Sequence, residues 1–193
     1  MSIKSFLGKQ LAKFVVSQTR KWSEAPIKTQ EKVFKHLIQT AKNTSFGRDH
    51  NFASIQTYED FKSSVPVRDY EGLRYYIERI QKGEKDVLWK GLPLFFAKTS
   101  GTTSGAKYIP LTKEALENQI KAAKDALLHY VVDSGKPHFI DGKMIFLQGS
   151  PVVSKDSIIP NGRLSGIVAN YVPSYLQSNR LPSYKTNCIE DWE

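Results

Sequence analysis

One segment constrains this 193-residue chain more than any other: a polar run from Thr99 to Lys107, set between two apolar pieces. It reads Thr-Ser-Gly-Thr-Thr-Ser-Gly-Ala-Lys and combines hydroxyl side chains, two glycines and a terminal cation. Leu92 to Ala97 precedes it and Tyr108 to Leu111 follows it, and both pieces have the length of short strands. A loop held by strands at both ends requires a sheet, so we expect an α/β fold.

The composition of this loop suits a polyphosphate ligand. Glycines let backbone N–H groups turn toward an anion without a Cβ in the way, hydroxyl groups add donors, and Lys107 adds a positive charge. The segment is not a Walker A loop, because three residues rather than four separate Gly101 from Gly105, and Ala106 precedes the lysine. A flexible Ser/Thr/Gly connector is the alternative that the pattern alone leaves open.

The residues around the loop predict helices before it and a mixed arrangement after it. We expect helices to start at Pro26, Thr57 and Asp69, and we expect a loop from Asn43 to Asn51 around Gly47. A long helix should run from about Lys113 to Val132, and Met144 to Leu147 is typical of a buried strand. The apolar face expected for the long helix consists of Leu116, Ile120, Ala123, Leu127 and Val131.

The first 22 residues predict a basic amphipathic helix. They carry several cations and no acid, and their apolar residues follow a helical period. Such a helix can be an organellar transit peptide or a membrane-surface helix, but we favour one that docks its apolar face on the domain. We therefore divide the chain into a helix at residues 1–25 and a domain at residues 26–193. The expected apolar face is Ile3, Leu7, Leu11, Phe14 and Val15.

Charge and composition disfavour several classes of protein. Hydrophobic residues at 40% and aromatic residues at 11% are typical of a folded domain. The net charge of +9 favours anionic ligands, but there is no dense basic run, so we expect no nucleic-acid partner. The histidine spacing indicates no metal site, and no apolar stretch is long enough to span a membrane. Cys188 is the one cysteine, which fits a reducing compartment, so we expect a cytoplasmic protein.

The stretch TSGTTSGAKYIPLT, from Thr99 to Thr112, closely resembles the phosphate-loop motif of the ANL adenylating superfamily. The extra Ser104 before Gly105, and Tyr108 after Lys107, depart from the usual superfamily pattern. They are similar to the auxin-responsive Gretchen Hagen family of acyl acid amido synthetases and its bacterial relatives. The resemblance implies part of an ANL-type N-terminal domain with an incomplete sheet. Other segments that resemble this family are Val65 to Val67, Tyr70-Glu71, Tyr76 to Ile80, and Arg163 to Ile167 followed by Pro173.

This resemblance implies an ATP-dependent ligase that works in two steps. A carboxylate oxygen of the acid attacks the α-phosphorus of ATP, so that pyrophosphate leaves and an acyl-adenylate forms; an amino acid amine then displaces AMP. Loop donors, Lys107 and Mg²⁺ would stabilise the charge on the departing pyrophosphate. Lys107 is the catalytic candidate. The residues that carry over as the ATP-binding loop are Thr99, Ser100, Gly101, Thr102, Thr103, Ser104, Gly105 and Lys107.

Two further family motifs, one for adenine and Mg²⁺ and one with an Asp for the ribose hydroxyls, have no match after the loop. We therefore expect the mobile C-terminal domain to be absent and the 193-residue piece to be inactive by itself. Two alternatives to the amido synthetase stay open. One is an acyl-CoA ligase of the same superfamily, with a thiol acceptor. The other is a non-catalytic module that binds a nucleotide or another anion.

Overall fold

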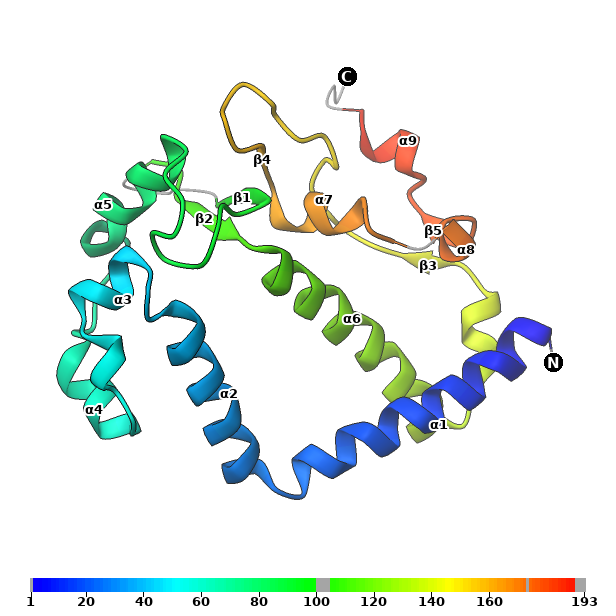
Figure 1. Ribbon diagram of the computed structural model, residues 1–193. Helices are drawn as coiled ribbons and strands as arrows, with labels where there is room; N and C mark the ends of the chain where they lie inside the picture. Colours follow the sequence, from blue (N-terminus) through cyan, green and yellow to red (C-terminus); the bar gives the residue numbers. More distant parts are fainter. Residues whose placement is uncertain (1, 100–104, 173, 190–193) are drawn as a thin grey trace. The chain divides into compact units, whose positions relative to one another are not determined.

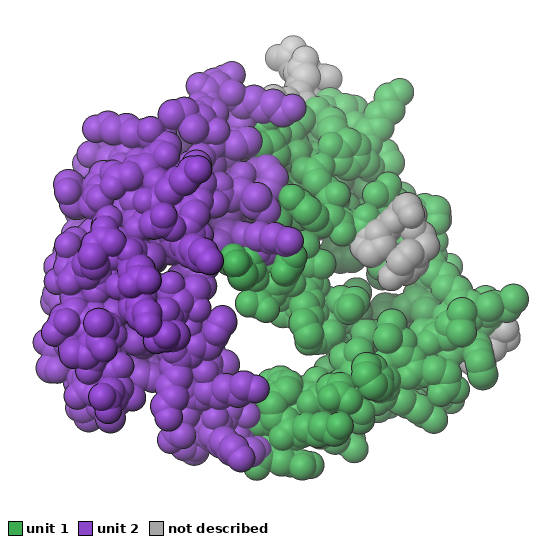
Figure 2. All heavy atoms as spheres, viewed as in Figure 1, with its two compact units in different colours: residues 1–24, 114–153, 162–193 green, residues 25–113, 154–161 purple. Residues whose placement is uncertain are grey.

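The computed structural model describes residues 2–99, 105–172 and 174–189. The chain divides into two compact units, each built from segments that are distant in the sequence (Figure 2). Unit 1 contains residues 1–24, 114–153 and 162–193, and unit 2 contains residues 25–113 and 154–161. The segment from Thr99 to Lys107 therefore belongs to unit 2.

Helices make up the first half of unit 2 (Figure 1). The Thr57 hydroxyl accepts a hydrogen bond from the Asp60 N–H, and the Asp60 carboxylate accepts one from the Thr57 N–H. The Asp69 carboxylate accepts from the Gly72 N–H at 2.9 Å. The predicted starts at Pro26, Thr57 and Asp69 are thus confirmed. The helical segments are α2 (Pro26–Ala41), α3 (Ser45–Asp49), η1 (Phe52–Ser54), α4 (Tyr58–Ser64) and α5 (Tyr70–Gln81).

The expected loop from Asn43 to Asn51 is wrong, because the short helix α3 forms inside it. The Thr44 hydroxyl caps this helix by accepting a hydrogen bond from the Gly47 N–H at 3.0 Å. An added Cβ on Gly47 would lie 2.1 Å from the Ala41 carbonyl oxygen. The glycine therefore permits close packing of α3 against the end of α2, and does not mark a loop.

A small sheet with the strand order β2-β1-β4 follows the helices. β1 (Phe95–Lys98) and β2 (Tyr108–Leu111) are antiparallel, with Lys98 opposite Tyr108 where the chain leaves and re-enters the sheet. The first strand starts later than predicted, because Pro93 has no N–H to donate to a partner strand. β2 lies at one edge of this sheet.

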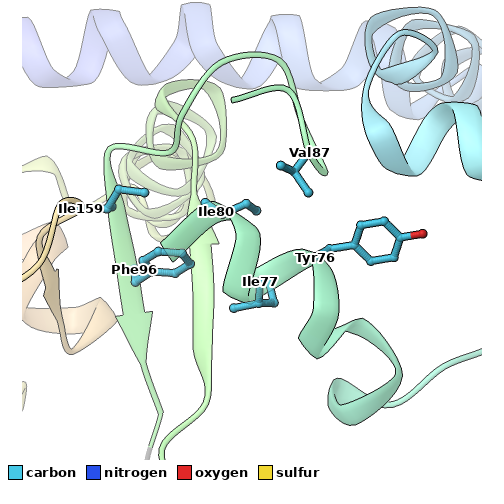
Figure 3. Packing of buried hydrophobic residues seen from close by; sticks show 6 residues of the cluster. All are labelled: Tyr76, Ile77, Ile80, Val87, Phe96 and Ile159. Carbon is cyan, nitrogen blue, oxygen red and sulfur yellow. The ribbon is translucent and has the colours of Figure 1, made fainter. Parts of the chain in front are cut away.

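The main core of unit 2 joins α5 to the sheet (Figure 3). Phe96 of β1 is only 2% exposed and meets Ile77 and Ile80 of the helix. The Tyr76 hydroxyl points away from Phe96 and donates a hydrogen bond to the Asp49 carboxylate at 2.8 Å. Burial, and then this bond, raise the pKa of Tyr76 above its usual value. The third strand, β4 (Asn161–Gly162), follows Ile159, which belongs to the same core.

Unit 1 is built on two long helices, α1 (Ile3–Ser23) and α6 (Lys113–Ser134), and the C-terminal end of α6 packs against the middle of α1 (Figure 1). The span of α6 agrees with the prediction. Its expected face is confirmed in part: Leu116 and Val131 are buried, but Ala123 is exposed, and Leu128 rather than Leu127 is buried where the helix meets α1. The remaining elements are η2 (Pro137–Asp141), β3 (Met144–Ile145), α7 (Leu164–Ala169), α8 (Ser174–Gln177), β5 (Arg180–Leu181) and α9 (Tyr184–Asn187).

The apolar face expected to dock α1 is also wrong in most of its members. Ile3 is 80% exposed and Phe14 is 61% exposed, whereas Ser5 and Ala12 on the opposite side are fully buried. An added Cβ on Gly8 would lie 2.6 Å from Cδ1 of Ile140 in η2. Small residues let the neighbouring backbone approach closely, so the small face packs and the large apolar face remains outside.

The buried strand expected at Met144 to Leu147 is reduced to the two residues of β3, and Leu147 is 96% exposed. β3 pairs in parallel with β5, and within the described part of the chain these two strands form a separate sheet. A two-stranded sheet covers little of its own surface, which is why the apolar run is not buried here.

Candidate functional site

The hairpin of β1 and β2 holds both ends of the loop that the sequence predicts to bind phosphate. The Thr99 N–H donates a hydrogen bond to the Lys107 carbonyl at 3.0 Å, one step beyond the last strand pair. The loop is therefore closed at its base by backbone bonds, as expected for a loop fixed within a domain. Five of the predicted ligand residues lie outside the described residues: Ser100, Gly101, Thr102, Thr103 and Ser104.

Gly105 adopts a backbone conformation that favours glycine. Its φ is +82°, in the left-handed region where a Cβ is unfavourable. An added Cβ would nonetheless meet no described residue within 4 Å. This arrangement fits the role predicted for the glycine, which is to let an anion approach the main chain.

Lys107 stands at the end of the loop with its side chain half-buried. Its Nζ lies 5.7 Å from the centroid of the Tyr70 ring, a cation–π contact. Among the carboxylates in the described ranges, none forms an ion pair with this ammonium group. A charge that no carboxylate neutralises remains available to an anionic ligand.

Tyr70 also binds the backbone beside Lys107, because its hydroxyl accepts a hydrogen bond from the Tyr108 N–H at 2.9 Å. Tyr70 belongs to one of the stretches that resemble the family, but it was not predicted as a site residue. No local pattern indicates this role, since the contact joins residues 38 positions apart on α5 and β2.

A small cavity of about 150 Å³ lies behind the hairpin in unit 2. Ligand pockets in proteins usually have volumes of about 300 Å³ or more, so this cavity is too small to hold ATP. The candidate phosphate site is therefore at the described C-terminal end of the loop, beside Gly105 and Lys107. The cavity is lined by Gln81, Phe96, Tyr108, Ser157, Ile159 and Asn161.

The described residues fit the first predicted ligand of the loop, ATP, differently from the second, Mg²⁺. Gly105, where an added Cβ would meet no described residue within 4 Å, and Lys107, which pairs with none of the described carboxylates, suit the phosphates of ATP. For Mg²⁺, the part of the chain that is described contains no group of three or more His, Cys, Asp or Glu side chains that could hold a metal.

The remaining family-like segments have structural explanations as well. An added Cβ on Gly166 would lie 2.0 Å from the Ser150 carbonyl oxygen, so the turn into α7 requires glycine. The Ser165 hydroxyl accepts a hydrogen bond from the Gly149 N–H at 3.0 Å. Pro173, which completes that segment, lies outside the described residues.

In the described ranges, no helix has both the length and the apolar character needed to cross a bilayer.

Comparison with known families decides the assignment. The sequence matches the GH3 family N-terminal domain over residues 15–192, which is most of its length. The chain belongs to the GH3 family. The resemblance inferred from the loop is thereby confirmed at the level of the family.

Named relatives of this GH3 chain are amino-acid-conjugating synthetases. The indole-3-acetic acid-amido synthetase GH3.15 of Arabidopsis thaliana is 31% identical over 153 residues, covering 77% of this chain and 24% of that protein. The jasmonoyl-L-amino acid synthetase JAR4 of Nicotiana attenuata is 25% identical over 126 residues, covering 64% of this chain and 21% of that protein. The GH3 chain thus spans about a quarter of the length of these relatives.

A solved structure supports the predicted fold class. The AtGH3.15 acyl acid amido synthetase in complex with 2,4-DB superposes on this chain with a TM-score of 0.72 at 25% sequence identity. The match covers 93% of this chain and 32% of that one. The fold is therefore an incomplete α/β domain with a helical N-terminal part, similar to the N-terminal region of that enzyme.

Proposed function

We propose that this chain supplies the ATP phosphate-binding loop of an acyl acid amido synthetase. The observation that carries the proposal is Lys107: it ends a loop closed by the β1–β2 hairpin, and its ammonium group has no carboxylate partner among the described residues. Membership of the GH3 family, whose named members here conjugate acids to amino acids, supports the same assignment.

The proposed chemistry is of the ANL type. An oxygen of the substrate carboxylate attacks the α-phosphorus of ATP, the bond to the β-phosphate oxygen breaks, and pyrophosphate leaves. The amine of an amino acid then attacks the acyl carbon, loses a proton and releases AMP. Lys107 and the loop donors, from Thr99 to Gly105, stabilise the negative charge on the departing pyrophosphate. Mg²⁺ bound with the nucleotide would share that charge.

The first test is the affinity of the 193-residue chain for MgATP, measured by calorimetry for the wild type, Lys107→Ala and Lys90→Ala. Removing a charged donor typically weakens a contact by about ten- to a hundredfold, so we expect that loss for Lys107→Ala. Lys90→Ala removes the same charge from an exposed position elsewhere in unit 2, and should retain the wild-type affinity. Equal losses in both variants, or no binding by a folded wild type, would contradict the proposal.

Equal losses together with a strong salt dependence would instead indicate a diffuse anion-binding module.

The remaining enzyme alternative, an acyl-CoA ligase, differs from an amido synthetase in the group that accepts the acyl chain. In a full-length protein that carries this segment, the adenylate is expected to be consumed by an amino acid amine and not by a thiol. The names of the relatives favour the amine. There, Lys107→Ala should lower acid-dependent ATP–pyrophosphate exchange by about 10²–10³-fold.

A further inference from the structure

Tyr70 contacts both the backbone and the side chain at the C-terminal end of the loop. We propose that Tyr70 is a positioning residue, which fixes the Lys107 ammonium group and the adjoining backbone at the phosphate site. This inference rests on the proposed function of the loop, but it concerns a residue of α5 that lies outside the loop motif. Three features support it: the backbone contact, the ring contact and the anchoring of Tyr70 itself.

The backbone contact protects an otherwise unpaired donor. β2 is an edge strand, and its Tyr108 N–H donates to the Tyr70 hydroxyl at 2.9 Å. The carbonyl of the same peptide group, that of Lys107, accepts a hydrogen bond from the Thr99 N–H at 3.0 Å. The peptide group between Lys107 and Tyr108 is therefore held by two hydrogen bonds, one to Thr99 beside β1 and one to Tyr70 of α5, so it has little freedom to move.

The ring contact restricts the long side chain of Lys107 without neutralising it. Nζ lies 5.7 Å from the Tyr70 ring centroid, within the distance at which a ring face attracts a cation. A carboxylate at this position would compete with a phosphate for the ammonium group, whereas the aromatic face carries no net charge. The ring thus restricts the position of the ammonium group and leaves its charge available to the ligand.

Tyr70 can act in this way because it is fixed independently of the loop. It is the first residue of α5, and the Asp69 side chain caps that helix through the Gly72 N–H at 2.9 Å. The Tyr70 ring also packs against the main core of unit 2, which contains Phe96. A site residue held by a capped helix and a packed core is placed more accurately than one held by a loop alone.

Three variants of the full 193-residue chain separate positioning from simple packing. Tyr70→Phe keeps the ring and removes the hydroxyl acceptor, and Tyr70→Leu removes the ring face as well. The matched control is Tyr75→Leu on the same helix: Tyr75 also has a cation over its ring, the Arg79 guanidinium at 5.1 Å, but its ring lies beside Tyr76 and is largely exposed. Near-UV circular dichroism checks that each variant is folded.

The first measurement needs no ligand. An aromatic face shifts the NMR signals of protons held above it, so the Lys107 side-chain protons should be shifted upfield in the wild type, Tyr70→Phe and Tyr75→Leu, and should lose the shift in Tyr70→Leu. In Tyr70→Phe the Tyr108 amide should exchange with solvent about three- to tenfold faster, because it loses its acceptor. Unchanged Lys107 signals in a folded Tyr70→Leu, or unchanged Tyr108 exchange in Tyr70→Phe, would each overturn the proposal. The second result can be obtained even if Tyr70→Leu does not fold.

The second measurement is a double-mutant cycle on MgATP affinity. Tyr70→Leu should weaken binding about threefold or more in the wild-type background and should have no further effect in Lys107→Ala. An equal loss in both backgrounds would mean that Tyr70 acts through general packing, and would overturn the proposal. Failure of the wild type to bind MgATP would refute the proposed function instead, and the Lys107 signals would still decide whether Tyr70 fixes the ammonium group.

Discussion

At the scale of single residues, Gly105 gives the sharpest prediction about the loop. Its φ of +82° disfavours any side chain, although an added Cβ would meet no described residue within 4 Å. We expect Gly105→Ala to cost about 1 kcal/mol in backbone strain, or to shift the loop backbone, and so to weaken MgATP binding about fivefold. Calorimetric titration of the variant measures this change.

Gly91 provides the matched control, because its φ is +78° and an added Cβ there also meets nothing within 4 Å. Gly91→Ala should lose a similar amount of stability in urea unfolding but keep its affinity for MgATP. If both variants bound as tightly as the wild type, the conformation of Gly105 would have no part in phosphate binding.

Only some residues of the candidate site could be predicted from the sequence. Gly105 and Lys107 could be selected from the sequence, because their chemistry belongs to the local run that carries them. Tyr70 could not, since a tyrosine near a helix start is usually a packing residue and the Tyr108 N–H that binds it lies 38 positions away. Local composition predicts which groups can bind a ligand, whereas tertiary contacts determine which groups hold them in place.

At the scale of elements, helix starts were more predictable than buried faces. Thr57 with Asp60, and Asp69 with Gly72, make the capping bonds that their spacing indicates. These signals are local and depend on no other element. The packed face of α1 depends on what approaches it, and η2 approaches the small residues. Hydrophobic periodicity alone therefore selected the wrong face.

Substitutions at two adjacent residues of α1 test which face of this helix is packed. Ala12 is fully buried, so Ala12→Leu should overpack the contact with α6 and destabilise the chain by about 1–3 kcal/mol. Leu11 is 44% exposed, so Leu11→Ser should change the stability by no more than about 0.5 kcal/mol. Urea unfolding followed by circular dichroism gives both values. A larger loss of stability in Leu11→Ser than in Ala12→Leu would show that α1 packs through the face that periodicity predicts.

A carboxylate also holds the start of α1, and it should make this contact sensitive to acid. The Ser5 hydroxyl, and then the Ser2 hydroxyl, donate to the Asp141 carboxylate and lower the pKa of Asp141. Because the folded-state pKa lies below the unfolded value of about 3.9, this stabilisation is present above that pH and is lost as the pH falls through the folded-state pKa.

We expect amide exchange in the first turns of α1 to accelerate more between pH 5 and pH 3 in the wild type than in Asp141→Asn, after correction for the intrinsic exchange rates. The control is Asp133→Asn, which changes an exposed carboxylate of α6 and should behave as the wild type does. An equal response in the wild type and Asp141→Asn would show that this carboxylate does not stabilise the start of the helix.

At the scale of the whole molecule, the loop and its supports are all contained in unit 2. The hairpin, α5 and the core around Phe96 come from residues 25–113 and 154–161. A ligand that binds only the folded form stabilises the unit that holds its site. Under the proposed function, the groups that bind the phosphates lie within this unit, whereas the complete reaction also needs groups for the adenine, the ribose, the acid and the amine.

We therefore expect the 193-residue chain to bind MgATP but to form no acyl-adenylate by itself. It spans 24% of the GH3.15 sequence, and no motif for the adenine or ribose follows its loop. Preorganised donors on the phosphates alone leave the acid and the α-phosphorus unaligned, and alignment of two reactants accounts for a large part of such rate enhancements. ATP–pyrophosphate exchange across a panel of aromatic and aliphatic acids, with Arabidopsis GH3.15 as the active control, measures this. Acid-dependent exchange by the isolated chain, abolished in Lys107→Ala, would show instead that this segment contains the whole adenylation site.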